Sequence, residues 1–211
     1  MSNFARTERH RLADLLTAGG PDAPTLCGGW TARDLAAHLV LREARPDAAA
    51  GIQLKPLAGW TDTVQRRYAA MDFAELVRRF RSGPPWYSPF ALPGADEAAN
   101  TVEYYVHAED VRRGEAWEPG PVDPGLEAAL WKRLPMLTRF ETARKTPVRL
   151  HLNHPDGRRV TVAEKHPQTV KLTGTPGELI LFAFGRGAHT TLTAEGTPEA
   201  LTALRKALPL P

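Results

Sequence analysis

The chain has 211 residues, of which 42% are hydrophobic and 24% charged, a composition typical of globular proteins rather than of fibres or disordered chains. Lysine and arginine number 27 and aspartate and glutamate 24, so the formal net charge is only +3. Because neither half of the sequence concentrates positive charge, we expect no binding to nucleic acid.

Three features of the sequence indicate the cellular location of the protein. The first ten residues become polar at once, unlike a signal peptide, and no stretch approaches the ~18 apolar residues of a membrane span. The single cysteine, Cys27, excludes an intrachain disulfide and favours a reducing compartment. We therefore expect a cytoplasmic protein without a membrane partner, either a monomer or a small homo-oligomer.

Helical patterns dominate the first part of the chain. Apolar residues at helical spacing predict a helix over residues 2–18. Thr31, with Asp34 three residues later, predicts the N-cap of a second helix that stops at Pro46. A third helix is expected from Trp60 to Arg81 with a break at Met71-Asp72, and a fourth from Asp96 to Arg113, closed by Gly114.

The pattern changes to strand-like alternation after Pro147. Asp156-Gly157 is typical of a hairpin turn between two of the expected strands. The fold class that follows is α+β, with an all-helical domain over residues 1–140 and a small α+β domain over residues 141–211. The expected strands cover 148–152, 160–162, 169–173 and 190–193, and the expected later helices cover 126–140, 176–185 and 198–208.

Three residues form a candidate metal site. Glu103 and His107 are four positions apart on one helix, so both can reach an ion ~2 Å from each, although an exposed pair would have the same spacing. His38 is the candidate third ligand, the alternative being a core histidine satisfied by hydrogen bonds. Three protein ligands leave one coordination position open, as in catalytic sites. We expect one divalent ion, Zn²⁺, which Ni²⁺ can replace.

A resemblance to a known family rests on two motifs. The segment 26–39, which contains Trp30-Thr31, Asp34-Leu35 and His38, resembles the signature of the mycothiol-dependent maleylpyruvate isomerase-like family. Glu103 and His107 match its second motif. The resemblance covers essentially the whole chain. It implies a DinB-like metal-binding four-helix bundle followed by a small α+β domain similar to sterol carrier proteins.

The resemblance also implies a chemistry. It implies mycothiol as a thiol cosubstrate and a metal that activates the thiolate for attack on a small electrophile, in an S-transferase or an isomerase. Of the 27 basic residues 21 are arginine, a bias that fits an actinobacterial origin, where mycothiol is made. A non-catalytic metal-containing binding or stress protein, and a metal-dependent hydrolase, are the alternatives. The chain is shorter than typical family members before the Glu103 helix, so we expect different substrate loops.

Several other residues invite a functional interpretation. Arg186 follows an apolar helix, as in the family's carboxyl-terminal domain, and is our candidate for binding a substrate carboxylate, the alternative being a solvated cation at a helix end. For Cys27 we expect apolar packing, and for Asp110 an exposed position rather than a contact with a metal ligand. The remaining candidates are a capping residue (Asp34), two histidines on opposite faces of a strand (His151 and His154), and three aromatic residues that line a pocket or cover the bundle (Trp86, Tyr87 and Phe90).

Overall fold

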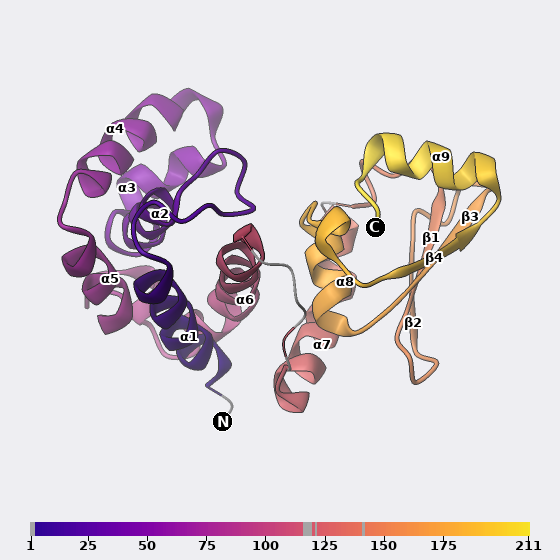
Figure 1. Cartoon of the computed structure of the whole chain (residues 1–211), viewed down its shortest axis with the longest axis horizontal. Helices are drawn as coiled ribbons and strands as arrows, with labels where there is room; N and C mark the ends of the chain where they lie inside the picture. The colour runs from indigo at the N-terminus through magenta and orange to yellow at the C-terminus, as the bar shows by residue number, and fades with distance from the viewer. Residues whose placement is uncertain (1–2, 116–119, 121, 141) are drawn as a thin grey trace. The chain divides into compact units, whose positions relative to one another are not determined.

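The computed structural model describes residues 3–115, 120, 122–140 and 142–211. The chain divides into two compact units, residues 1–117 and 118–211 (Figure 1). The first unit is helical and the second combines helices with a four-stranded sheet, so the predicted α+β fold class is confirmed. None of the helices in these described ranges is long and apolar enough to span a membrane.

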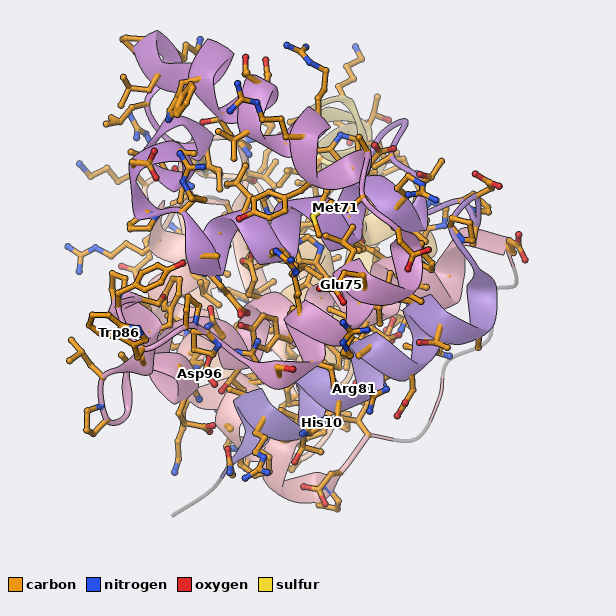
Figure 2. All side chains as sticks on the ribbon, turned by 90° about the vertical axis from the view of Figure 1, so that its left-hand side faces the viewer. His10, Met71, Glu75, Arg81, Trp86 and Asp96 are labelled. Atoms are coloured by element: carbon orange, nitrogen blue, oxygen red, sulfur yellow. The ribbon has the colours of Figure 1, made fainter. Side chains whose placement is uncertain are left out.

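The first unit is built around long helices joined by short helical turns. α1 packs along α6, and α2 packs against α4 and α5 (Figure 1). α1 also lies beside α5, which brings His10 and Arg81 onto one face, whereas Trp86 projects at an edge (Figure 2). The helices are α1 (Phe4–Gly19), α2 (Ala32–Ala44), α3 (Pro46–Ala49), α4 (Ala58–Ala69), α5 (Phe73–Ser82) and α6 (Ala95–Glu115), with 3-10 turns at Ala50–Ile52, Lys55–Leu57 and Pro89–Ala91.

Local sequence signals explain where these helices begin. Thr31 and Asp34 form the predicted capping box, in which each side chain accepts a hydrogen bond from the backbone N–H of the other. The predicted break at Met71-Asp72 is also confirmed, because the carboxylate of Asp72 accepts from the backbone of Glu75 at the start of α5.

Gly114 has a different role from the one expected. It lies inside α6 rather than beyond its end. A Cβ at this position would lie 2.1 Å from the carbonyl oxygen of Pro24, so only glycine lets the 21–30 loop pass so close to α6. The backbone N–H of Leu26 donates to the carbonyl of Asp110, which fixes the same loop on α6.

The core of the first unit is apolar at its centre and contains a buried polar cluster. The Arg9 guanidinium donates to both carboxylate oxygens of Glu43, at 2.6 and 2.7 Å, and to the hydroxyl of Tyr104 and the carboxylate of Asp96. Arg9 and Glu43 are each only 3% exposed, so this ion pair joins α1, α2 and α6 inside the protein. Fully buried apolar side chains make up the rest of this core, among them Leu12, Leu16, Leu35, Leu39, Leu76 and Phe80.

The second unit contains a four-stranded sheet in the order β2-β1-β3-β4. β1 pairs antiparallel with β2 and parallel with β3, and β3 pairs antiparallel with β4. Alternate residues such as Leu150, Leu152, Val170 and Leu172 are fully buried, as the period-two pattern predicts. The elements are α7 (Pro124–Phe140), β1 (Arg149–Asn153), β2 (Arg159–Val162), β3 (Thr169–Thr173), α8 (Pro176–Ala183), a 3-10 turn (Gly187–His189), β4 (Thr193–Gly196) and α9 (Pro198–Ala207).

Two features of the second unit differ from expectation. The predicted strand at 190–193 is wrong, because the backbone N–H of Thr191 donates to the carboxylate of Glu178 rather than to a strand. Pairing with β3 begins only at Thr193. The helix expected at the end of the first domain is α7, which packs against α8 and belongs to the second unit, so the chain divides well before the expected boundary at residue 140.

Candidate metal centre

His38 is placed by α2 and by a tryptophan in the preceding loop. The capping box fixes the start of α2, and His38 follows Asp34 by about one turn. His38 is 7% exposed, and its ring centroid lies 5.1 Å from that of Trp30. Packing of this kind restricts the ring to one orientation, directed toward α6.

α6 supplies two further donors to the same point. Nε2 of His107 lies 3.3 Å from Oε1 of Glu103, and Nε2 of His38 lies 3.8 Å from the same oxygen. The donor atoms of all three residues lie within 4.8 Å of one another. Donors bound at ~2.0–2.1 Å in a tetrahedral site are separated by about 3.4 Å, so this spacing fits a tetrahedral divalent ion.

The other side of the His107 ring is held by residues for which we expected no such role. Nδ1 of His107 lies 2.9 Å from Oδ2 of Asp110, which is fully buried rather than exposed. Cys27 is half-buried, and its Sγ lies 3.0 Å from the same oxygen and 3.7 Å from Nδ1. The expectation for Asp110 was therefore wrong, because the 21–30 loop folds back onto α6. Cys27 packs against the apolar core as expected and in addition contacts Asp110.

These contacts do not form a catalytic triad. In such a triad the nucleophile and the acid contact opposite nitrogens of the histidine ring. Here Cys27 and Asp110 both contact Nδ1, and Nε2 faces Glu103. The geometry instead lets the Nδ1–H of His107 donate to Asp110, which would leave Nε2 to bind a cation at the three-donor site.

Burial and hydrogen bonding set the charges of the site. Burial lowers the pKa of His38, which favours the neutral imidazole that a metal needs. Burial also disfavours charge on Glu103, but hydrogen bonds from His107 and His38 hold the pKa of this carboxyl well below its usual value. Burial opposes charge on His107, whereas its bond to Asp110 raises the pKa well above the usual value.

Arg42 is a neighbour of the site that the sequence analysis missed. Its Nε lies 3.5 Å from Oε1 of Glu103, and its guanidinium lies over the ring of Phe90 at 4.8 Å. Nη1 donates to the side-chain carbonyl of Asn100 on α6. The sequence feature that could have identified Arg42 is its position one turn after His38, which puts both residues on the same face of α2.

The remaining sequence candidates lie elsewhere. Tyr87 is more than half exposed and Trp86 is 89% exposed, so of the three aromatic residues only Phe90 reaches a neighbour of the site. His154 contacts the ring of Trp131 in the second unit. The guanidinium of Arg186 donates to the carbonyl of Phe184, also in the second unit, and a role for Arg186 in substrate binding stays a prediction.

Comparison with known proteins identifies the fold. No family profile and no curated protein matches the sequence. The solved structure of the mycothiol-dependent maleylpyruvate isomerase matches with a TM-score of 0.61 over 91% of this chain and 90% of that one, at 18% identity. The chain has the fold of this isomerase. A histidine-to-alanine variant of the same enzyme matches with a TM-score of 0.60 at 17% identity, again over 91% and 90% of the two chains.

Proposed function

We propose that the chain is a metal-dependent enzyme that uses mycothiol as a thiol cosubstrate, as an isomerase or an S-transferase acting on a small electrophile. The convergence of His38, Glu103 and His107 carries this proposal. The fold shared with an isomerase described as mycothiol-dependent supports the choice of thiol. The sequence motif around His38 and the Glu103–His107 pair support it independently.

The donor set suits activation of a thiol. Two neutral imidazoles and one carboxylate leave a divalent ion with a net charge of about +1, which favours an anionic fourth ligand. A bound Zn²⁺ lowers the pKa of a coordinated thiol from about 8.5 and so supplies a thiolate at neutral pH. We propose Zn²⁺ as the resident ion, and Ni²⁺ fits the same imidazole donors.

The surrounding residues of the chain would orient the donors rather than react. Asp110 holds the His107 ring so that Nε2 faces Glu103, and Trp30 packs on the ring of His38. Arg42 places a positive charge beside the carboxylate of Glu103. In the second unit, we propose that Arg186 binds the carboxylate of an acidic electrophile, because a guanidinium can hold a carboxylate through two parallel hydrogen bonds.

A thiol-conjugation assay tests the proposal. The zinc-loaded protein is incubated with mycothiol and a generic electrophile such as chlorodinitrobenzene, and the conjugate is measured against a metal-free sample. We expect metal-dependent conjugation that His38→Ala abolishes together with metal binding. A matched control, His166→Ala in the second unit, is expected to keep both. Metal binding without conjugation across several electrophiles would favour a non-catalytic metal-containing protein instead.

A further inference from the structure

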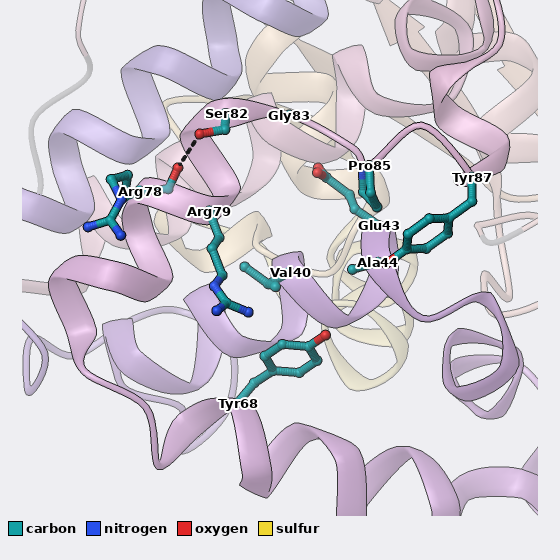
Figure 3. A pocket seen from close by; sticks show the side chains of 10 residues that line it. All are labelled: Val40, Glu43, Ala44, Tyr68, Arg78, Arg79, Ser82, Gly83, Pro85 and Tyr87. Carbon is teal, nitrogen blue, oxygen red and sulfur yellow. Dashed lines mark hydrogen bonds between the residues drawn. The ribbon is translucent and has the colours of Figure 1, made fainter.

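A pocket lies in the first unit, on another face of α2 from His38. Its volume is about 330 Å³, and it opens between α2, α4, α5 and the loop that follows α5 (Figure 3). Val40 and Ala44 line it from α2, and Val40 lies about 200° around that helix from His38. The pocket is therefore separate from the metal centre and belongs to none of the chemistry proposed above. We call it the Tyr68 pocket.

The walls of the Tyr68 pocket combine flat rings with polar side chains. Tyr68 on α4 and Tyr87 in the loop place phenol rings at two sides of the space, and Pro85 adds a third flat surface (Figure 3). The methyl groups of Val40 and Ala44 lie between them. Aromatic rings prefer offset or edge contacts with other rings, so this arrangement favours a planar ring as the occupant.

One cation is directed into the space. Nε of Arg79 donates to Oε1 of Glu75 at 2.7 Å, which fixes the guanidinium, and its terminal nitrogens point toward Tyr68 and Val40 (Figure 3). Arg78 also lines the pocket, but its guanidinium points away from Tyr68 in the same view. Glu75 contacts both arginines, so the three side chains together keep one positive charge.

The carboxylate at the floor of the pocket does not cancel this charge. Glu43 lines the pocket, but both its oxygens accept from Arg9, and one also accepts from the hydroxyl of Tyr104. Its charge is thus satisfied inside the core. The opening of the pocket is consequently positive, and the rings of Tyr68 and Tyr87 lie at two of its sides.

We propose that the Tyr68 pocket binds a small planar aromatic carboxylate, with the ring between Tyr68 and Tyr87 and the carboxylate on the terminal nitrogens of Arg79. Its volume lies at the lower end of the ~300–1,000 Å³ range of small-molecule sites, which suits one or two fused rings. A guanidinium and a carboxylate form the strong, charge-assisted kind of hydrogen bond, so the carboxylate gives the site its selectivity.

Calorimetric titration of the full chain with 2-naphthoate tests this site. We expect 2-naphthoate to bind at least about tenfold more tightly than 2-naphthalenemethanol, which lacks the charge, and than cyclohexanecarboxylate, which lacks the aromatic ring. Arg79→Gln is expected to weaken binding of 2-naphthoate about tenfold, whereas Arg67→Gln, at an exposed position of α4 outside the pocket lining, leaves it unaltered. Equal affinity for the acid and the alcohol, or no binding of 2-naphthoate, would overturn the proposal.

Two further variants locate the bound molecule. Ala44→Trp fills the pocket and is expected to abolish binding, with circular dichroism as the check of folding; should it not fold, the Arg79→Gln and Arg67→Gln pair decides. His38→Ala removes a donor of the metal centre and is expected to bind 2-naphthoate as the parent chain does. Loss of binding in His38→Ala, or its survival in folded Ala44→Trp, would place the molecule elsewhere and refute the assignment.

Discussion

Nδ1 of His107 lies 2.9 Å from the carboxylate of Asp110, and Nε2 of the same ring lies 3.3 Å from the carboxylate of Glu103. One imidazole is therefore held between two acids of its own helix, one turn away on either side. Asp110 accepts the Nδ1 proton, which leaves the Nε2 lone pair for a cation that Glu103 also faces. The tautomer of His107 follows from this spacing along α6.

We predict that Asp110→Asn weakens Zn²⁺ binding by about 10- to 100-fold, because an amide no longer fixes the His107 ring as the carboxylate does. Competition for Zn²⁺ with a chromophoric chelator measures the loss. Asp62→Asn on α4, an exposed acid, is the matched control and is expected to retain the parent affinity. Unchanged affinity in folded Asp110→Asn would show that Asp110 does not orient the donor.

The second prediction concerns the buried ion pair. Replacing Arg9 with Met leaves the Glu43 carboxylate without its partner in the core, which is expected to lower the free energy of unfolding by about 3–5 kcal/mol. Urea denaturation measures this value. Arg81→Met removes an exposed partner of Asp14 and is expected to cost less than about 1 kcal/mol. Similar losses in the two variants would contradict the structural importance of the Arg9 pair.

Gly114→Ala tests the close approach between α6 and the 21–30 loop. The new Cβ meets the backbone of Pro24, so the loop must move, and we expect a loss of about 1–3 kcal/mol in unfolding free energy. Gly59→Ala on α4 has open space around its Cβ and is expected to be neutral or to stabilise by up to about 1 kcal/mol. A Gly114→Ala protein as stable as the parent would rule out this packing.

The pH dependence of stability is expected to depend on Glu109. Burial alone would raise its pKa, but hydrogen bonds from Arg112 and Arg11 lower it overall below the ordinary value of 4.5. A lowered pKa in the folded state gives stability that is present above the unfolded pKa and lost as the pH falls through the folded one. Glu109→Gln is therefore expected to be less stable near neutral pH and to lose less stability below about pH 4.5.

Urea unfolding across this pH range compares the two proteins. The exposed Glu195→Gln serves as the control and is expected to follow the parent curve. Parallel curves for the parent and Glu109→Gln would mean that Glu109 binds its proton equally in the folded and unfolded states.

The last prediction separates substrate binding from metal binding. Arg186→Ala is expected to keep the metal content of the parent and to lose thiol-dependent turnover of an acidic electrophile, because positioning of a carboxylate and coordination of the ion are separate tasks. Arg205→Ala on α9 is a control within the same unit. Full turnover in Arg186→Ala would remove this residue from the substrate site.

Local signals predicted the helices of this chain well. The Thr31–Asp34 capping box and the cap at Asp72 need only a few neighbouring residues, so the sequence contains the whole interaction. The strand expected at 190–193 failed because Thr191 bonds with Glu178, a residue of another element. The strand propensity of residues 190–193 contains no information about a hydrogen bond to Glu178.

The residues of the candidate site could be predicted where their spacing in the sequence matches the period of a helix. The spacing of Glu103 and His107 places both on one face of a helix, and a leucine-rich helix identified His38. The contact between Cys27 and Asp110 could not be predicted in this way. The two residues are far apart in sequence and meet where the loop before α2 lies against α6, with the backbone N–H of Leu26 bonded to Asp110. No single-helix pattern predicts a contact that a loop makes across the bundle.

The wide separation of His38 and Glu103 along the chain has a consequence for assembly. About 65 residues lie between them, so a long loop must close before the donors meet, and helix formation alone brings none of them together. Contacts of such long range form late and slowly during folding. We therefore expect a refolding chain to bind Zn²⁺ at the rate at which α2 docks against α6. This rate is slower than that of the earlier formation of helical structure.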